Sequence, residues 1–157
     1  MVAHHQSGQH QAGMIAHVQP QSRREEDLMT TLEYLHPEGL FKGKVPLSPA
    51  VKAGKFVFVS GTPAFDAAGT LMLGNFSAQM KQVMENIACI LTSAGAGWDR
   101  VVKMNVMLIR REDFDEMNRV YATYFSEGNF PARTSTIVAA LPQPGFLLEI
   151  ECVAMLK

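Results

Sequence analysis

A switch in hydrophobic period near residue 75 constrains the fold of this chain more than any other feature. Residues 55–60, Lys-Phe-Val-Phe-Val-Ser, are rich in β-branched and aromatic side chains and predict a strand. From residue 80 to residue 91 the apolar side chains instead recur at spacings of three and four, the stripe of an amphipathic helix. A second strand at 101–109 and a second helical stripe at 114–125 repeat this change. These patterns predict an α+β protein.

Polar and glycine residues mark the ends of the two helices. Asn75 or Ser77 is expected to cap the first helix, Gly95 with Gly97 to end it, and Gly128 to close the second. The other predicted strands are an edge strand at 40–42, a return strand at 70–73 after a turn at 66–69, and strands at 135–140 and 146–156. The expected architecture is a mixed sheet of about six strands with both helices on one face.

Such a sheet has a second face with no helix to cover it. In the strand at 55–60, Phe56 and Phe58 point one way while Val57 and Val59 point the other, so both faces are apolar. Self-association is the simplest way to bury the second face, and it would place ligand pockets between subunits.

Composition argues against several classes of function but identifies none. A chain of 157 residues suits one domain, and its formal charge of −1 gives no support for a nucleic-acid or anionic-membrane partner. Cys89 and Cys152 lie in apolar surroundings without metal-ligand spacing, which favours inert packing thiols in a cytoplasmic protein. No apolar run approaches the length of about 20 residues that spans a membrane.

The first 28 residues differ from the rest, since they hold four of the five histidines and few large apolar residues. We interpret residues 1–28 as a flexible or non-native extension, and residues 29–157 as a single domain. A metal-binding arm is the alternative, but the histidine spacing matches no defined metal site.

Candidate chemistry is concentrated near the C-terminus. The domain from residue 29 contains one histidine, His36, so a histidine base or a histidine-rich metal site is not expected. Arg133 follows a proline at the start of an apolar segment, where its guanidinium needs an anion. A protein carboxylate or a ligand would serve, and composition alone slightly favours an ion pair. Glu149 and Glu151 flank Ile150 and are expected to point to opposite faces.

Several short motifs together resemble one family. They are Lys52-Ala-Gly-Lys-Phe-Val-Phe-Val-Ser-Gly61, Met84-Glu-Asn-Ile87, Ala94-Gly95, Asp113-Phe114, Met117-Asn-Arg-Val-Tyr121, Pro131-Ala-Arg133, Leu141-Pro142 and Glu149-Ile-Glu151. In this order they resemble the Rid family of reactive intermediate deaminases, also called YjgF-like or L-PSP endoribonuclease-like proteins. The resemblance covers residues 45–157.

The resemblance implies a chorismate-mutase-like α+β fold in a homotrimer with clefts between subunits. It implies a hydrolase that converts 2-imino or enamine acids to 2-keto acids and ammonia without a metal or organic cofactor. Arg133 would clamp the substrate carboxylate, and Glu149 would position or activate water. The residues expected to line the cleft beside them are Ser60, Gly61, Ser135, Asn118 and Leu47.

Two positions depart from the family pattern. Leu47 stands where deaminases of this family usually carry a tyrosine, and Thr62 replaces the usual glutamine after Ser-Gly. Leu47 cannot supply a hydroxyl group, which keeps open a non-catalytic protein that binds or senses small carboxylates such as 2-keto acids. A ribonuclease, the activity in the older family name, is less favoured because the chain is nearly neutral and lacks a histidine pair in its domain.

Overall fold

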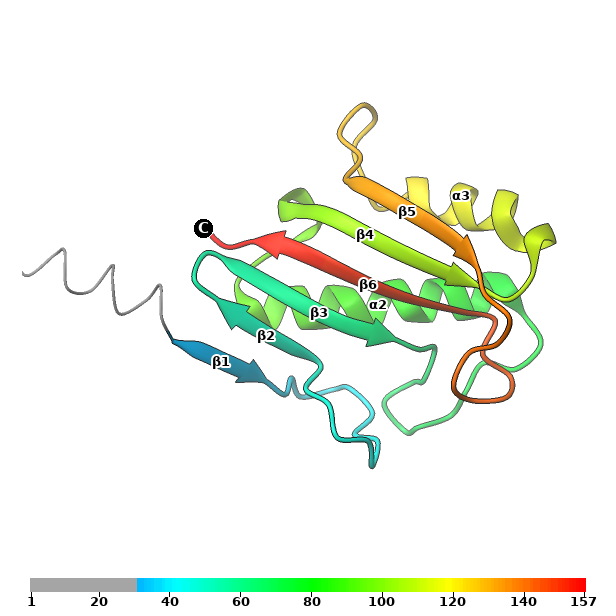
Figure 1. Cartoon of the computed structure of the whole chain (residues 1–157), viewed down its shortest axis with the longest axis horizontal. Helices are drawn as coiled ribbons and strands as arrows, with labels where there is room; N and C mark the ends of the chain where they lie inside the picture. The colour runs from blue at the N-terminus through cyan, green and yellow to red at the C-terminus, as the bar shows by residue number, and fades with distance from the viewer. Residues whose placement is uncertain (1–30) are drawn as a thin grey trace, which may run out of the picture.

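The computed structural model describes residues 31–157, and the predicted extension at 1–28 lies outside the described residues. Six strands form one mixed sheet in the order β1-β2-β3-β6-β4-β5, in which only β4 and β5 run parallel. The strands are β1 (Leu32–Leu35), β2 (Ala50–Ala53), β3 (Phe56–Thr62), β4 (Val101–Leu108), β5 (Ala132–Ile137) and β6 (Leu148–Met155). The helices α2 (Phe76–Ala94) and α3 (Phe114–Ala122) lie on the same side of this sheet, as predicted (Figure 1).

The long helix α2 supplies most of the core. Asn75 caps it by accepting a hydrogen bond from the backbone N–H of Ala78, and Gly95 ends it with a φ of 83°. The buried stripe packs against the inward side chains of β3 and β6. Its fully buried members include Met80, Met84, Ile87 and Leu91. Truncating Met84 to alanine would cost roughly 2–5 kcal/mol of folding free energy, because a large side chain would leave a cavity.

Several predicted boundaries were wrong. Residues 40–42 form no strand; the outer strands of that half are β1 and β2, where no strand was predicted. The return strand at 70–73 is a single bridge between Phe65 and Leu71. The second helix ends at Ala122 rather than near Gly128, and β5 begins at Ala132 instead of 135. Short strands such as β1 are fixed by pairing with neighbours, which a local pattern does not record.

The face of the sheet away from the helices, which we call the open face, carries large apolar side chains. Its members include Leu32, Tyr34, Phe56 and Phe58, between 42% and 60% exposed, with Met155 at 37% beside them. Val57 and Val59 are buried on the opposite face. The predicted alternation within β3 is therefore confirmed, and the described chain leaves its open face uncovered (Figure 1).

Candidate active site

Glu149 lines a groove large enough for a small molecule. The groove has a volume of about 1090 Å³ and runs between the 40–49 segment and the end of β3. It brings together four of the seven predicted site residues, namely Leu47, Ser60, Gly61 and Glu149. The roles of these residues stay predictions, and the other three predicted residues, Arg133, Ser135 and Asn118, do not line this groove.

The close approach of β3 to β6 explains the glycine at position 61. The register of the two strands shifts between Val59 and Thr62, so Gly61 lies against the Glu149 side chain. A methyl group at residue 61 would overlap Glu149 Oε1 and come within 3.0 Å of its Cδ atom. Gly61 thus leaves the space that the Glu149 carboxylate occupies.

Burial changes the chemistry of Glu149. Its pKa is raised above the ordinary value, first because burial penalises the charged carboxylate and second because Glu151 places a like charge nearby. A carboxyl group with a raised pKa binds a proton more readily than an exposed glutamate does, which suits a group that accepts and returns a proton. None of the ion pairs within residues 31–157 involves Glu149.

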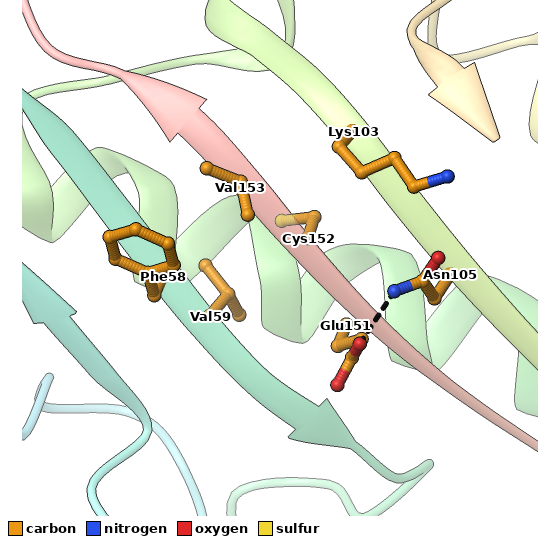
Figure 2. Close-up of a pocket in the computed structure, with 7 residues that line it drawn as sticks. All are labelled: Phe58, Val59, Lys103, Asn105, Glu151, Cys152 and Val153. Atoms are coloured by element: carbon orange, nitrogen blue, oxygen red, sulfur yellow. Dashed lines mark hydrogen bonds between the residues drawn. The ribbon is translucent and has the colours of Figure 1, made fainter. Parts of the chain in front are cut away.

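The expectation that Glu149 and Glu151 point to opposite faces was wrong. Residues two apart on a strand share a face. The buried residues of β6 alternate with the two glutamates, as Leu148, Ile150 and Cys152 show. Both carboxylates therefore lie on the open face. Figure 2 shows Glu151 on β6 pointing toward Asn105 of β4, whose Nδ2 donates a hydrogen bond of 2.6 Å to Glu151 Oε1.

Hydrogen bonds hold Ser60 and the Leu47 backbone in place. The Ser60 hydroxyl donates a 2.7 Å hydrogen bond to the carbonyl oxygen of Ser48, which ties β3 to the 40–49 segment. Leu47 is held in a tight turn by a 2.9 Å bond from its N–H to the carbonyl oxygen of Val45, and its side chain is 51% exposed. The groove wall at residue 47 is therefore apolar.

Arg133 lies in a different place, on the helix-covered face of the edge strand β5. Its Nη2 donates a 2.7 Å hydrogen bond to Asn118 Oδ1, and its Nη1 lies 3.7 Å from Met117 Sδ. The guanidinium carbon stands 4.7 Å from the centre of the Tyr121 ring, within cation–π distance. Asn118 thus holds Arg133, a role that the sequence did not distinguish from contact with substrate.

The ion-pair interpretation of Arg133 was wrong for the described chain. The ion pairs among residues 31–157 are Lys52–Glu33, Arg110–Asp113 and Arg119–Glu116, and none includes Arg133. Tyr121 and Asn118 satisfy part of the guanidinium without neutralising its charge. The remaining donors suit a carboxylate, which a planar guanidinium binds with two parallel hydrogen bonds.

Ser135 follows Arg133 by two residues and shares its face of β5. The Ser135 hydroxyl is buried without a hydrogen-bond partner among the described residues, as is the Tyr121 hydroxyl. A buried hydroxyl without a partner is costly and is often completed by a ligand or a neighbouring molecule. Tyr121 was missed as a member of this cluster; its place one turn after Met117 on the predicted helical stripe was the available signal.

The cysteines fit the packing role that was predicted for them. Cys152 is buried, and burial raises the pKa of its thiol to about 12. Cys89 is half-buried, with its Sγ atom 3.5 Å from the carbonyl oxygen of Glu38. Within residues 31–157 no cluster of three or more His, Cys, Asp or Glu side chains is arranged to hold a metal ion. In the same range, neither helix is long and apolar enough to cross a membrane.

Residues 41–156 match the family model described as Endoribonuclease L-PSP. The chain belongs to this family, the Rid family. It is 41% identical to a RutC family protein of Synechocystis over 71% of this chain and 86% of the relative. It is 40% identical to human 2-iminobutanoate/2-iminopropanoate deaminase, over 70% of this chain and 80% of the relative. The crystal structure of RidA from an Antarctic Psychrobacter matches with a TM-score of 0.74 and 37% identity, covering 79% of this chain and 99% of that one.

Proposed function

We propose that this Rid-family protein hydrolyses 2-imino acids to 2-keto acids and ammonia in clefts formed between copies of the chain. The observation that carries the proposal is Arg133, a half-buried guanidinium that no carboxylate of the described chain neutralises. Relatives at about 40% identity are named 2-iminobutanoate/2-iminopropanoate deaminase, and their names point to an acid with a carboxylate for such an arginine to bind.

The positions of Arg133 and Glu149 support clefts that two copies share. Within one chain, Arg133 contacts α3 on the helix side, whereas Glu149 is on the open face. One substrate molecule cannot bridge two faces of a packed sheet. We propose that Arg133 and Ser135 of one copy complete the Glu149 groove of the next, in a homotrimer that covers the open faces.

The chemistry needs few groups. Water attacks the C2 carbon of the imine while the Glu149 carboxylate accepts its proton, and the C2–N bond becomes a single bond in a carbinolamine. The Glu149 carboxyl group returns that proton to nitrogen, which completes the carbinolamine. Glu149 then takes the hydroxyl proton and passes it to nitrogen as the C2–O bond becomes a double bond and the C2–N bond breaks, so that ammonia leaves with the 2-keto acid. Arg133 binds the C1 carboxylate and fixes C2 beside the water, and such positioning can supply much of the rate.

A non-catalytic binder of small carboxylates is the second candidate, and Leu47 favours it. The side chain lines the groove and has no hydroxyl group to offer a water or a substrate nitrogen. Arg133 would bind a 2-keto acid as well as a 2-imino acid, because both present the same carboxylate. The two candidates therefore differ in turnover, not in ligand binding.

One assay separates the candidates. An amino-acid oxidase generates 2-imino acids in situ, semicarbazide traps them, and the protein is expected to reduce the trapped fraction. We expect Arg133→Ala to lower this activity by about a hundredfold or more, because the carboxylate clamp is lost. Arg119→Ala is the matched control, since Arg119 is an exposed α3 arginine paired with Glu116.

The outcomes are distinct. Turnover by the wild type that survives Arg133→Ala would show that Arg133 is not the carboxylate clamp. No turnover with any amino acid, together with measurable 2-keto acid binding that Arg133→Ala removes, would assign the protein as a binder.

A further inference from the structure

We propose that Glu151 is a positioning residue of the cleft, whose carboxylate, held by Asn105, keeps Glu149 able to carry a proton. For its role in turnover this inference rests on the function proposed above. Glu151 belongs to a second, smaller cavity of about 150 Å³ on the open face, which also includes Lys103 and Asn105 (Figure 2).

The Glu151 carboxylate is held in a fixed position. Asn105 is its register partner on β4, and the 2.6 Å hydrogen bond from Asn105 Nδ2 holds the Glu151 carboxylate against the sheet. The nearby cation, Lys103, forms no ion pair with Glu151 within residues 31–157; its Nζ atom donates to Thr134 Oγ1 at 2.7 Å instead. Glu151 thus presents an oriented negative charge beside Glu149, about 7 Å along the strand.

On the sheet, the other neighbours of Glu149 are uncharged. Its register partner on β4 is the uncharged Met107, and on β3 it meets Gly61. Farther along the groove wall stand four titratable groups, Tyr34, His36, Lys42 and Lys44. In the assembled cleft an Arg133 from another copy would face Glu149 as well. None of these groups is a carboxylate. Glu151 is therefore the neighbour whose negative charge favours protonation of Glu149.

Direct titration tests this coupling without any substrate. The carboxyl carbon of Glu149 can be followed by ¹³C NMR in the intact protein, with its signal assigned by Glu149→Gln. Glu151→Gln keeps the side-chain length and an amide oxygen that can accept from Asn105, but removes the charge. We expect it to lower the Glu149 pKa by about half a unit to one unit. Burial would keep the remaining pKa above the ordinary value.

Glu151→Asp is the matched control, since it retains the charge on the same face and should leave the Glu149 pKa within about 0.3 units of wild type. An unchanged Glu149 pKa in a folded Glu151→Gln variant would overturn the proposal. So would an equal fall in both variants, because that would assign the effect to packing and not to charge.

The pH profile of turnover gives the second readout. Glu149 must be ionised to accept a proton from water, so kcat/KM falls as the pH drops through its pKa. Glu151→Gln should move this acid limb to lower pH, while Glu151→Asp should not. If the wild type shows no turnover, the proposed deaminase function fails while the NMR titration still decides the coupling. If turnover is present and the acid limb stays in place, the catalytic part of this inference is wrong.

Discussion

The two main candidate residues lie on opposite faces of the sheet. On the helix side, Arg133 lies against Asn118 and Tyr121, a rigid setting built from α3 and the edge strand β5. On the open face, Glu149 lies in a groove made by β3, β6 and an irregular segment, with an uncovered apolar surface alongside. The proposed carboxylate clamp, Arg133, is thus held by contacts with α3, whereas the proposed proton acceptor, Glu149, borders a surface that a second copy is expected to cover.

Under the function proposed above, the site is incomplete in a single chain. Within residues 31–157, Arg133 has no carboxylate partner and the buried hydroxyls of Ser135 and Tyr121 have no hydrogen-bond partner, while the desolvated Glu149 lies on the other face of the sheet. Burying an unpaired charge or an unsatisfied hydroxyl costs folding free energy, and contacts within the described chain do not offset it. Both costs fall if the β5 edge of one copy packs against the Glu149 groove of another.

The largest expected effect comes from a charge on the open face. Phe58 is 47% exposed there, and Phe58→Asp would place an ionised carboxylate where a second copy is expected to pack. We expect the assembly to dissociate to a monomer of 17.3 kDa and turnover to fall by about a hundredfold or more. Light scattering with size-exclusion chromatography measures the first effect.

The matched control is Leu73→Asp, because Leu73 is 71% exposed but lies in the loop before α2. It should leave the assembly intact. Dissociation by both variants, or by neither, would contradict the assignment of the open face as the interface.

A smaller effect is expected from filling the space beside Glu149. In Gly61→Ala the new methyl group overlaps the carboxylate, so Glu149 must rotate away from its position. We expect kcat/KM to fall by about tenfold to a hundredfold, since misplacing a catalytic group by about 1 Å has this cost. In a Glu149→Ala background the same change should have almost no further effect, and additivity of the two losses would refute the contact.

Glu149→Gln should cost activity yet gain stability at neutral pH. The folded-state pKa of Glu149 is raised above its unfolded value, so its contribution to folding is favourable at low pH and is lost as the pH rises through the folded pKa. Glutamine removes this loss, and we expect Tm at pH 7 to rise by roughly 1–3 °C. The gain should shrink below the pKa of an unperturbed glutamate; a gain that grows toward low pH would reverse the assigned sign.

The smallest effect concerns the hydroxyl of Tyr121. Its oxygen is buried without a partner, and burial raises its pKa to about 12. Tyr121→Phe keeps the ring under Arg133 and removes the unsatisfied group, so the unfolding free energy should stay equal or rise by up to about 1 kcal/mol. Urea unfolding measures this, and a loss of more than about 1 kcal/mol would show that the hydroxyl has a partner in the assembled protein.

The sequence predicted the helices and the central strands well, because α2 and β4 carry long, regular patterns. It failed at β1 and β2, which are four residues long and owe their form to pairing across the sheet. The site residues came from motif resemblance, and no pattern along the chain could report that Arg133 and Glu149 face opposite ways. That fact depends on the register of β5 on β4 and β6 beside β3, which is set by contacts distant in sequence.

Subunit mixing tests the central claim most directly. Arg133→Ala and Glu149→Gln are each expected to be inactive, and their coexpression gives assemblies that contain both chains. If two copies share each cleft, some clefts combine an intact Arg133 with an intact Glu149, and random mixing should restore about a quarter of the wild-type activity. If one chain holds the whole site, mixed assemblies of confirmed composition would be no more active than either variant alone, and the shared cleft would be disproved.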